Sequence, residues 1–222
     1  MRWYARRLSR GHGSRGGCRR SRWLVLRNAR CGSDRSGEAC VFGIREQRKV
    51  MAMKAQDVLV ALKLSRLGAR PRYADLAAAL GLSGSEVHAA VRRLADARLL
   101  DPETGRVRGG ALHEFLVHGL PYVFPVRPGE VTRGVPTAWA IPVLAESLAE
   151  ADGLPPVWPD PEGSSRGVAV EPLYPSVPGA ARRDPVLHEL LALVDALRLG
   201  RARERVRAED LLARRLQPDA GA

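Results

Sequence analysis

Cysteine is scarce in this chain of 222 residues, and Cys18, Cys31 and Cys40 all lie among the first 50. An odd number of cysteines argues against a disulfide framework, and no Cys-x-x-Cys pair offers the ligand spacing of a zinc site. The chain beyond residue 51 has no cysteine, which excludes a thiol nucleophile and a thiolate metal centre from that region. We therefore expect no bound metal and no cofactor.

Long hydrophobic runs are also missing from the basic N-terminal segment. Its longest apolar stretch, around Trp23 to Leu26, is too short for a secretory signal or a membrane-spanning helix. We therefore expect no membrane partner and a cytoplasmic, nucleoid-associated location. The Arg- and Ser-rich, acid-poor composition of this segment is also typical of an organellar transit peptide, although a clear amphipathic helix is lacking.

Familiar catalytic patterns are absent as well. There is no His-Glu-x-x-His motif, because His113 and His118 are five residues apart rather than four, and no Gly-rich phosphate loop precedes a helix. Ser164 and Ser165 lie in a proline-rich region rather than on the strand–turn–helix of a nucleophile elbow. We therefore do not expect an enzyme.

The formal net charge of +12 is unevenly distributed along the chain. Residues 1–50 hold 14 Lys and Arg against three acidic residues, a net of +11, so the remainder is almost neutral. Residues 61–110 carry nine basic and five acidic residues, whereas residues 111–180 carry three basic and eight acidic ones. The positive excess that would attract nucleic acid within the body of the chain therefore falls on residues 61–110.

Residues 1–50 are predicted to form a disordered basic extension. They are rich in Arg, Gly and Ser and lack an apolar period, so they cannot bury enough surface to offset the entropy of ordering. Charge, cysteine content and periodicity all change near Met51 and Met53, and we expect the natural start of the protein there, with the upstream residues a mis-assigned extension. If they are translated, a basic arm that contacts phosphates is the functional alternative.

The most informative pattern is LAAALGLSGSEVHAAVRRLADARLL, over residues 76–100. Apolar residues recur at helical spacing up to Leu80, and Gly81 follows where a left-handed residue would end the helix. Ser83 stands three residues before Glu86, which is the spacing of a capping box at the start of a new helix. The pattern predicts two helices joined by a tight turn.

The second of these helices, predicted over residues 84–97, has an apolar stripe and an outward-facing set. The buried stripe is formed at helical spacing by Val87, Ala90, Val91 and Leu94. The other faces, which are available to DNA, carry Ser85, His88, Ala89, Arg92 and Arg93. Because capped amphipathic helices around a glycine also occur in ordinary helical proteins, further features are needed to favour DNA binding.

The neighbouring segments supply such features. Helices are predicted over residues 54–68 and 73–80, and a turn over residues 101–105 is flanked by Arg106 and Arg108. This turn predicts a short β-hairpin wing whose arginines rest on phosphates or reach the minor groove. We therefore assign a winged helix-turn-helix domain to residues 51–110.

The rest of the chain divides into two parts. Residues 111–183 are acidic and proline-rich, and we expect a short helix over 111–119, extended segments over 122–142, and then an irregular connector anchored by Trp158 and Tyr174. Residues 184–217 predict amphipathic helices over 185–199 and 202–216. The fold class expected is mainly α with a short β-hairpin wing, a proline-rich connector and C-terminal helices.

The stretch LAAALGLSGSEVHAAVRRLADARLLDPETGRV resembles the helix-turn-helix and wing of bacterial MarR-like winged-helix transcriptional regulators, over about residues 54–108. The later FLVHGLPYVFPV and TRGVPTAWA segments resemble an extension of small regulators of this kind. The resemblance implies sequence-specific binding to double-stranded DNA, with the third helix in the major groove and usually as a homodimer on a palindromic site. The small wing and the absence of a long N-terminal dimerisation helix depart from that pattern, so dimerisation through the C-terminal helices is a hypothesis.

The resemblance also implies roles for individual residues. Recognition-helix positions fall on Ser85, His88, Ala89 and Arg92, and phosphate or wing contacts on Arg93, Arg106 and Arg108. Arg92 is the strongest candidate for base readout, since a guanidinium can pair bidentately with guanine; a phosphate contact is the alternative. We expect a transcriptional regulator, in the simplest case a repressor. The alternative is a protein-interaction or antitoxin-like partner whose winged domain only regulates its own gene or mediates protein contacts.

Overall fold

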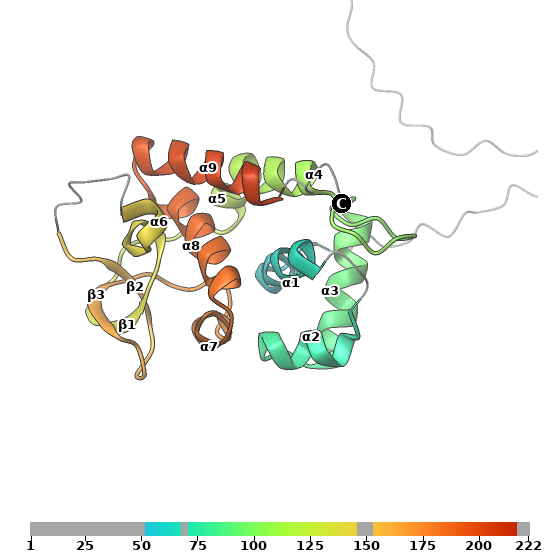
Figure 1. The fold of residues 1–222 in the computed structure, drawn as a ribbon, viewed down its shortest axis with the longest axis horizontal. Helices are drawn as coiled ribbons and strands as arrows, with labels where there is room; N and C mark the ends of the chain where they lie inside the picture. The colour runs from blue at the N-terminus through green and yellow to red at the C-terminus, as the bar shows by residue number, and fades with distance from the viewer. Residues whose placement is uncertain (1–51, 68–70, 146–152, 217–222) are drawn as a thin grey trace, which may run out of the picture. The chain divides into compact units, whose positions relative to one another are not determined.

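In the computed structural model, residues 52–67, 71–145 and 153–216 are described. The predicted extension over residues 1–50 lies outside them. Helices dominate the fold and one small sheet accompanies them, which confirms the expectation of a mainly α protein (Figure 1). Among the helices in these three ranges, none has the length and apolar character needed to cross a bilayer.

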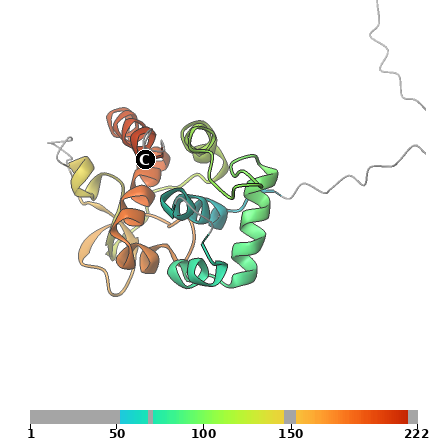
Figure 2. The ribbon, with the colours of Figure 1, turned by 45° about the vertical axis from the view of Figure 1, so that its right-hand side comes forward.

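The first three helices pack against one another around a shared apolar core. They are α1 (Ala55–Leu67), α2 (Tyr73–Leu80) and α3 (Gly84–Asp96), and Figures 1 and 2 both show α1 beside the other two. Their buried side chains include Val58, Leu62, Leu76, Leu80, Val87, Ala90 and Leu94. The predicted apolar stripe of α3 is confirmed, except that Val91 is only partly buried.

The turn between α2 and α3 follows the local signals of the sequence. Gly81 ends α2 in the left-handed conformation, with φ of 65°, and its N–H donates to the carbonyl of Ala77. Ser83 Oγ accepts the N–H of Glu86 at 3.2 Å, and Glu86 Oε2 accepts the N–H of Ser83 at 2.8 Å. The predicted capping box is therefore confirmed.

The predicted β-hairpin wing is reduced to one antiparallel bridge. Leu100 pairs with Val107, and the Asp101 N–H donates to the Arg106 carbonyl at 2.9 Å. The N–H of Gly105, which has φ of 71°, donates back to the Asp101 carbonyl at 2.8 Å. One helix ends at Asp96, just before the bridge, and the next begins at Gly109, just after it, so the ladder is not extended and two strands do not form.

A helical segment follows this bridge directly. It comprises α4 (Gly109–Glu114), the π-helical η1 (Phe115–Gly119) and α5 (Leu120–Val123), so the helix predicted over residues 111–119 is longer at both ends. Its inward side buries Leu112, Leu116 and Leu120. α4 packs against the last helix of the chain, and η1 and α5 pack against α8 (Pro185–Leu199).

The proline-rich region forms a small closed sheet. β1 (Val131–Pro136) pairs antiparallel with both β2 (Pro156–Pro159) and β3 (Ser165–Ala169), and β2 pairs parallel with β3. A Cβ atom at Gly134 would lie 2.0 Å from the carbonyl oxygen of Trp158, so only glycine permits this approach. The prediction of extended segments over residues 122–142 is confirmed where β1 forms, but it is wrong at the end of α5 and over Ala138–Ala140, which are helical.

The prediction of an irregular connector after residue 146 is wrong, because β2, β3 and α7 (Val177–Arg183) lie there. Its prolines occupy places that tolerate a missing N–H: Pro156 and Pro159 at the ends of β2, and Pro178 in the first turn of α7. They therefore bound regular elements rather than prevent them.

The C-terminal helices are α8 (Pro185–Leu199) and α9 (Ala202–Leu216), as the sequence predicts. α8 packs against α1, α7, α9 and η2 (Ala138–Ala140), a 3₁₀ turn that is followed by α6 (Pro142–Ala145). Both views show α8 between α1 and the sheet (Figures 1 and 2). Lys63 of α1 donates to Asp184, the N-cap of α8, at 2.6 Å. This ion pair fixes α8 to the first three helices.

A buried carboxylate joins the sheet to α8. Asp195 accepts hydrogen bonds from Trp158 Nε1 at 2.5 Å and Thr137 Oγ1 at 3.1 Å, and it pairs with Arg198 at 2.5 Å. Burial raises the pKa of Asp195, and Arg198 and the two donors oppose that rise. With all three donors paired, this polar cluster satisfies itself inside the core.

Candidate nucleic-acid interface

The outer face of α3 presents three of the predicted contact residues in one stripe. Ser85, His88 and Arg92 are exposed, and Ala89 is half-buried beside them. Their spacing of three and four residues places them on one side of the helix. The opposite side of α3 is buried against α1 and α2, so this polar stripe is held in a fixed orientation.

Arg93 does not belong to this stripe, and its assignment to phosphate contact is corrected. The residue is 3% exposed, and its guanidinium donates to both carboxylate oxygens of Asp57 in α1, at 2.8 and 2.6 Å. One residue beyond Arg92, the helix has turned by about 100°, which directs Arg93 toward α1. The bonds to Asp57 raise the pKa of Arg93, and its charge is used within the fold.

Asp57 is the residue that sequence reasoning missed. It lies on α1 at helical spacing from the buried Ala61 and Leu64, so it is an acidic side chain on an apolar face. A carboxylate is rarely buried without a cationic partner. That pattern was a signal for a buried ion pair, although it could not identify the partner.

The two arginines predicted for the wing remain available. Arg106 and Arg108 are exposed on either side of Val107, which forms the bridge with Leu100. Neither guanidinium pairs with a carboxylate among the described residues. The reduced hairpin thus still carries two cations directly after α3 in the chain.

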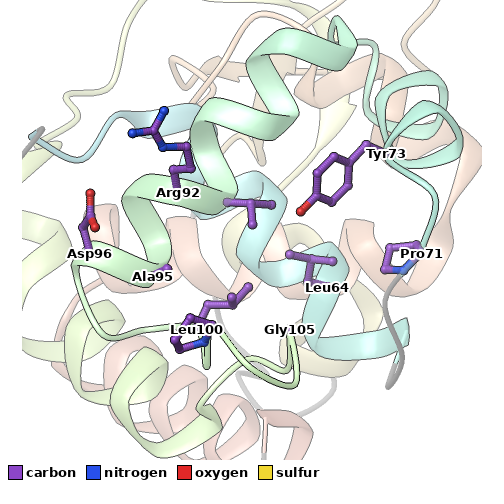
Figure 3. A pocket seen from close by; sticks show the side chains of 10 residues that line it. Leu64, Pro71, Tyr73, Arg92, Ala95, Asp96, Leu100 and Gly105 are labelled. Carbon is purple, nitrogen blue, oxygen red and sulfur yellow. The ribbon is translucent and has the colours of Figure 1, made fainter.

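A cavity of about 280 Å³ lies beside the polar stripe, between α3, the start of α2 and the turn at residues 102–105 (Figure 3). Most of its lining is apolar and comes from Leu64, Pro71, Val91, Ala95, Leu100 and Pro102. Arg92 and Asp96 border it on α3, and the Tyr73 ring faces them from α2. The Tyr73 ring also meets His88 edge-on, with 6.0 Å between ring centroids. Arg92 therefore borders an apolar hollow, and His88 contacts Tyr73, one of the residues that line it.

The end of α2 and the start of α3 are contacted by the C-terminal half of the chain. Tyr174 donates from its hydroxyl to Glu86 at 3.0 Å, and Arg183 donates to the carbonyl of Ala79 at 3.1 Å. Hydrogen bonds from the Ser83 backbone and side chain and from Tyr174 lower the pKa of Glu86. Tyr174 and Trp158 thus anchor their segments, as the sequence predicts.

No family model matches this chain, and neither does any curated protein or solved structure. The resemblance to MarR-like regulators accordingly stays a prediction that depends on the motif residues themselves. The described ranges contain no group of three His, Cys, Asp or Glu side chains placed to hold a metal ion.

The positive charge near α3 is smaller than the sequence implies. Two basic residues of the 61–110 segment, Lys63 and Arg93, are neutralised by Asp184 and Asp57, which lie outside that segment. Exposed cations nevertheless remain in the described part of this segment, at Arg66, Arg72, Arg92, Arg98, Arg106 and Arg108. The surface can therefore still attract a polyanion, with fewer charges than the count of residues predicts.

Proposed function

We propose that this protein is a DNA-binding transcriptional regulator of winged helix-turn-helix type, with α3 in the major groove of double-stranded DNA. The observation that supports this most strongly is the stripe of Ser85, His88 and Arg92, exposed on a helix whose other side is buried. Arg106 and Arg108, exposed after the same helix, add two cations for the phosphate backbone.

The chemistry of the stripe suits base readout. The Arg92 guanidinium can donate two parallel hydrogen bonds to O6 and N7 of guanine, and such a pair is worth about 1–3 kcal/mol of discrimination. His88 and Ser85 can each donate or accept a hydrogen bond toward base edges or phosphates. Arg93 takes no part, because its charge is already paired with Asp57.

The simplest mechanism is repression by occupancy of a promoter, as a homodimer on a palindromic site. In this arrangement two copies of α3 enter successive major grooves on one side of the duplex. The C-terminal helices remain the proposed dimer interface. Sedimentation velocity with and without operator DNA tests dimerisation, and a monomer on DNA would contradict the dimer.

A gel shift with the promoter region of the protein's own gene, at several salt concentrations, tests DNA binding. Retention should be sequence-specific and should weaken as salt rises, because phosphate contacts release counterions. Arg92→Ala should relax the preference at one base pair by about tenfold to a hundredfold. Arg106→Ala and Arg108→Ala should instead weaken binding to all sequences and reduce the salt slope by about one each.

Arg127→Ala provides the matched control, because Arg127 is an exposed arginine between α5 and β1, outside both the proposed DNA interface and the C-terminal helices. It should bind DNA as the unchanged protein does. A uniform loss in Arg92→Ala would assign that residue to phosphate contact, and equal losses in the Arg92 and Arg127 variants would remove α3 from the interface.

A second candidate function is protein interaction, in which the chain is an antitoxin-like partner and the winged domain only regulates its own gene. The specific observation is a pair of apolar side chains at the end of α5, Tyr122 and Val123, which are 81% and 54% exposed. No retention of DNA at low salt, together with a co-purifying protein that is lost in Tyr122→Ser, would favour this function over the first.

A further inference from the structure

Strands β1 and β3 place two arginines directly opposite each other. Arg133 is in register with Arg166, and the Ala169 N–H donates to the Glu130 carbonyl at 2.9 Å. That bond makes Glu130 and Ala169 a hydrogen-bonded pair, and the two kinds of pair alternate along an antiparallel ladder. Arg133 and Arg166, three positions further along, are therefore a non-hydrogen-bonded pair, in which side chains lie closest together. Like charges at such a position repel and destabilise a sheet, unless a counter-charge lies between them.

The described part of the chain provides no such counter-charge. Neither guanidinium forms an ion pair or a hydrogen bond with another described residue, and both side chains are exposed. Two carboxylates lie in the turn just after β2, but Arg182 pairs with both of them, Asp160 and Glu162. Asp160 also accepts the N–H of Glu162 at 2.8 Å. These acids are therefore engaged elsewhere.

The two arginines border an open hollow of about 500 Å³. Its lining is polar apart from one residue and consists of Val131, Thr132, Arg133, Ser164, Ser165 and Arg166. Ser164, in the bend just before β3, lines the same hollow as Arg166, and its hydroxyl bonds to no other described residue. Guanidinium groups offer only donors, and together with a hydroxyl they match the acceptor oxygens of a tetrahedral oxyanion.

We propose that Arg133, Arg166 and Ser164 bind the phosphate group of a small phosphorylated ligand. Two forked guanidiniums can each bind two phosphate oxygens, and the bound charge removes the repulsion across the strands. A small ligand fits better than a nucleic-acid backbone because residues 111–180 carry eight acidic against three basic residues, which repels a polyanion. The site shares no residue with the proposed DNA interface, so each can fail without the other.

An NMR titration of the full chain with inorganic phosphate, at constant ionic strength, tests the site. Saturable amide shifts should be confined to residues 131–134 and 164–167. Arg133→Gln and Arg166→Gln should each weaken binding at least about tenfold, since each removes a charge-assisted contact. Arg203→Gln, an exposed arginine of α9, should leave the affinity unchanged.

Thermal melting gives a second readout that also shows whether the variants fold. Phosphate should raise the melting temperature of the unchanged protein but not that of Arg133→Gln. In phosphate-free buffer the variant should melt at the same temperature as the unchanged protein or higher, because the cross-strand repulsion is gone. A lower melting temperature of Arg133→Gln in phosphate-free buffer would contradict the inference that Arg133 lacks a counter-charge.

Three further outcomes would overturn the proposal. One is the absence of saturable shifts with both inorganic phosphate and ribose 5-phosphate. Another is an equal response at all exposed arginines, including Arg203, which would indicate screening by salt. The third is a short DNA duplex that shifts the same amides at lower concentration than either phosphate, which would assign the pair to a nucleic-acid backbone.

Discussion

Replacing Arg93 with alanine should destabilise the protein strongly, whereas the same change at the adjacent Arg92 should not. Arg93 is 3% exposed and its partner Asp57 is fully buried. Asp57 accepts two bonds from Arg93 and one from the Lys54 N–H at 2.8 Å. Without the Arg93 guanidinium, the buried Asp57 carboxylate keeps only the Lys54 N–H as a hydrogen-bond donor.

The expected magnitude follows from that burial. Removing one partner of a buried ion pair costs about 3–5 kcal/mol, because the other charge is left uncompensated. For a folded region of this size each kcal/mol lowers the melting temperature by roughly 2–4 °C, so Arg93→Ala should melt about 6–20 °C lower. Arg92 is exposed, and its replacement should change stability by less than about 0.5 kcal/mol.

Urea denaturation followed by far-ultraviolet circular dichroism measures both variants, and similar slopes would show that the midpoint reports stability alone. The double variant Asp57→Leu, Arg93→Met should recover most of the loss, because no charge then remains buried. If Arg93→Ala were as stable as Arg92→Ala, the buried pair would be refuted. Arg93 would then return to the candidates for phosphate contact.

Two other predictions follow from the fold. Gly134→Ala should lower the free energy of unfolding by about 1–3 kcal/mol or more, because its Cβ would lie 2.0 Å from the Trp158 carbonyl oxygen. Gly110→Ala, with open space around it, should cost little stability. Equal melting temperatures of the two variants would contradict the close approach at Gly134. Burial raises the pKa of Asp184, but the bonds from Lys63 and the α8 amides outweigh it and hold that pKa below 3.8. Asp184 therefore stabilises the fold above pH 3.8, and this contribution is lost as pH falls through its folded-state pKa. Acid titration of unfolding should show a smaller decrease in Asp184→Asn, and an identical decrease would contradict this.

Helices α1, α2, α3, α8 and α9 were predictable because their signals are local. Gly81 and the Ser83–Glu86 box satisfy backbone groups within a few residues of themselves, so sequence alone locates the end of α2 and the start of α3. Pro185 and the leucine spacing after it likewise predict α8. Such bonds need no distant partner, and the outward position of Arg92 follows from the helical period once α3 is placed.

The sheet and the two sets of arginines were decided by tertiary structure. Gly134 and the prolines of β2 resemble loop residues until the three strands close on one another, and only that closure brings Arg133 opposite Arg166. Arg92 and Arg93 are identical neighbours in the sequence, yet Asp57, 36 residues from Arg93, makes one of them part of the core. The sequence by itself determines the helices and their faces, since these depend on neighbouring residues. Which charges remain free depends on pairing over long distances along the chain.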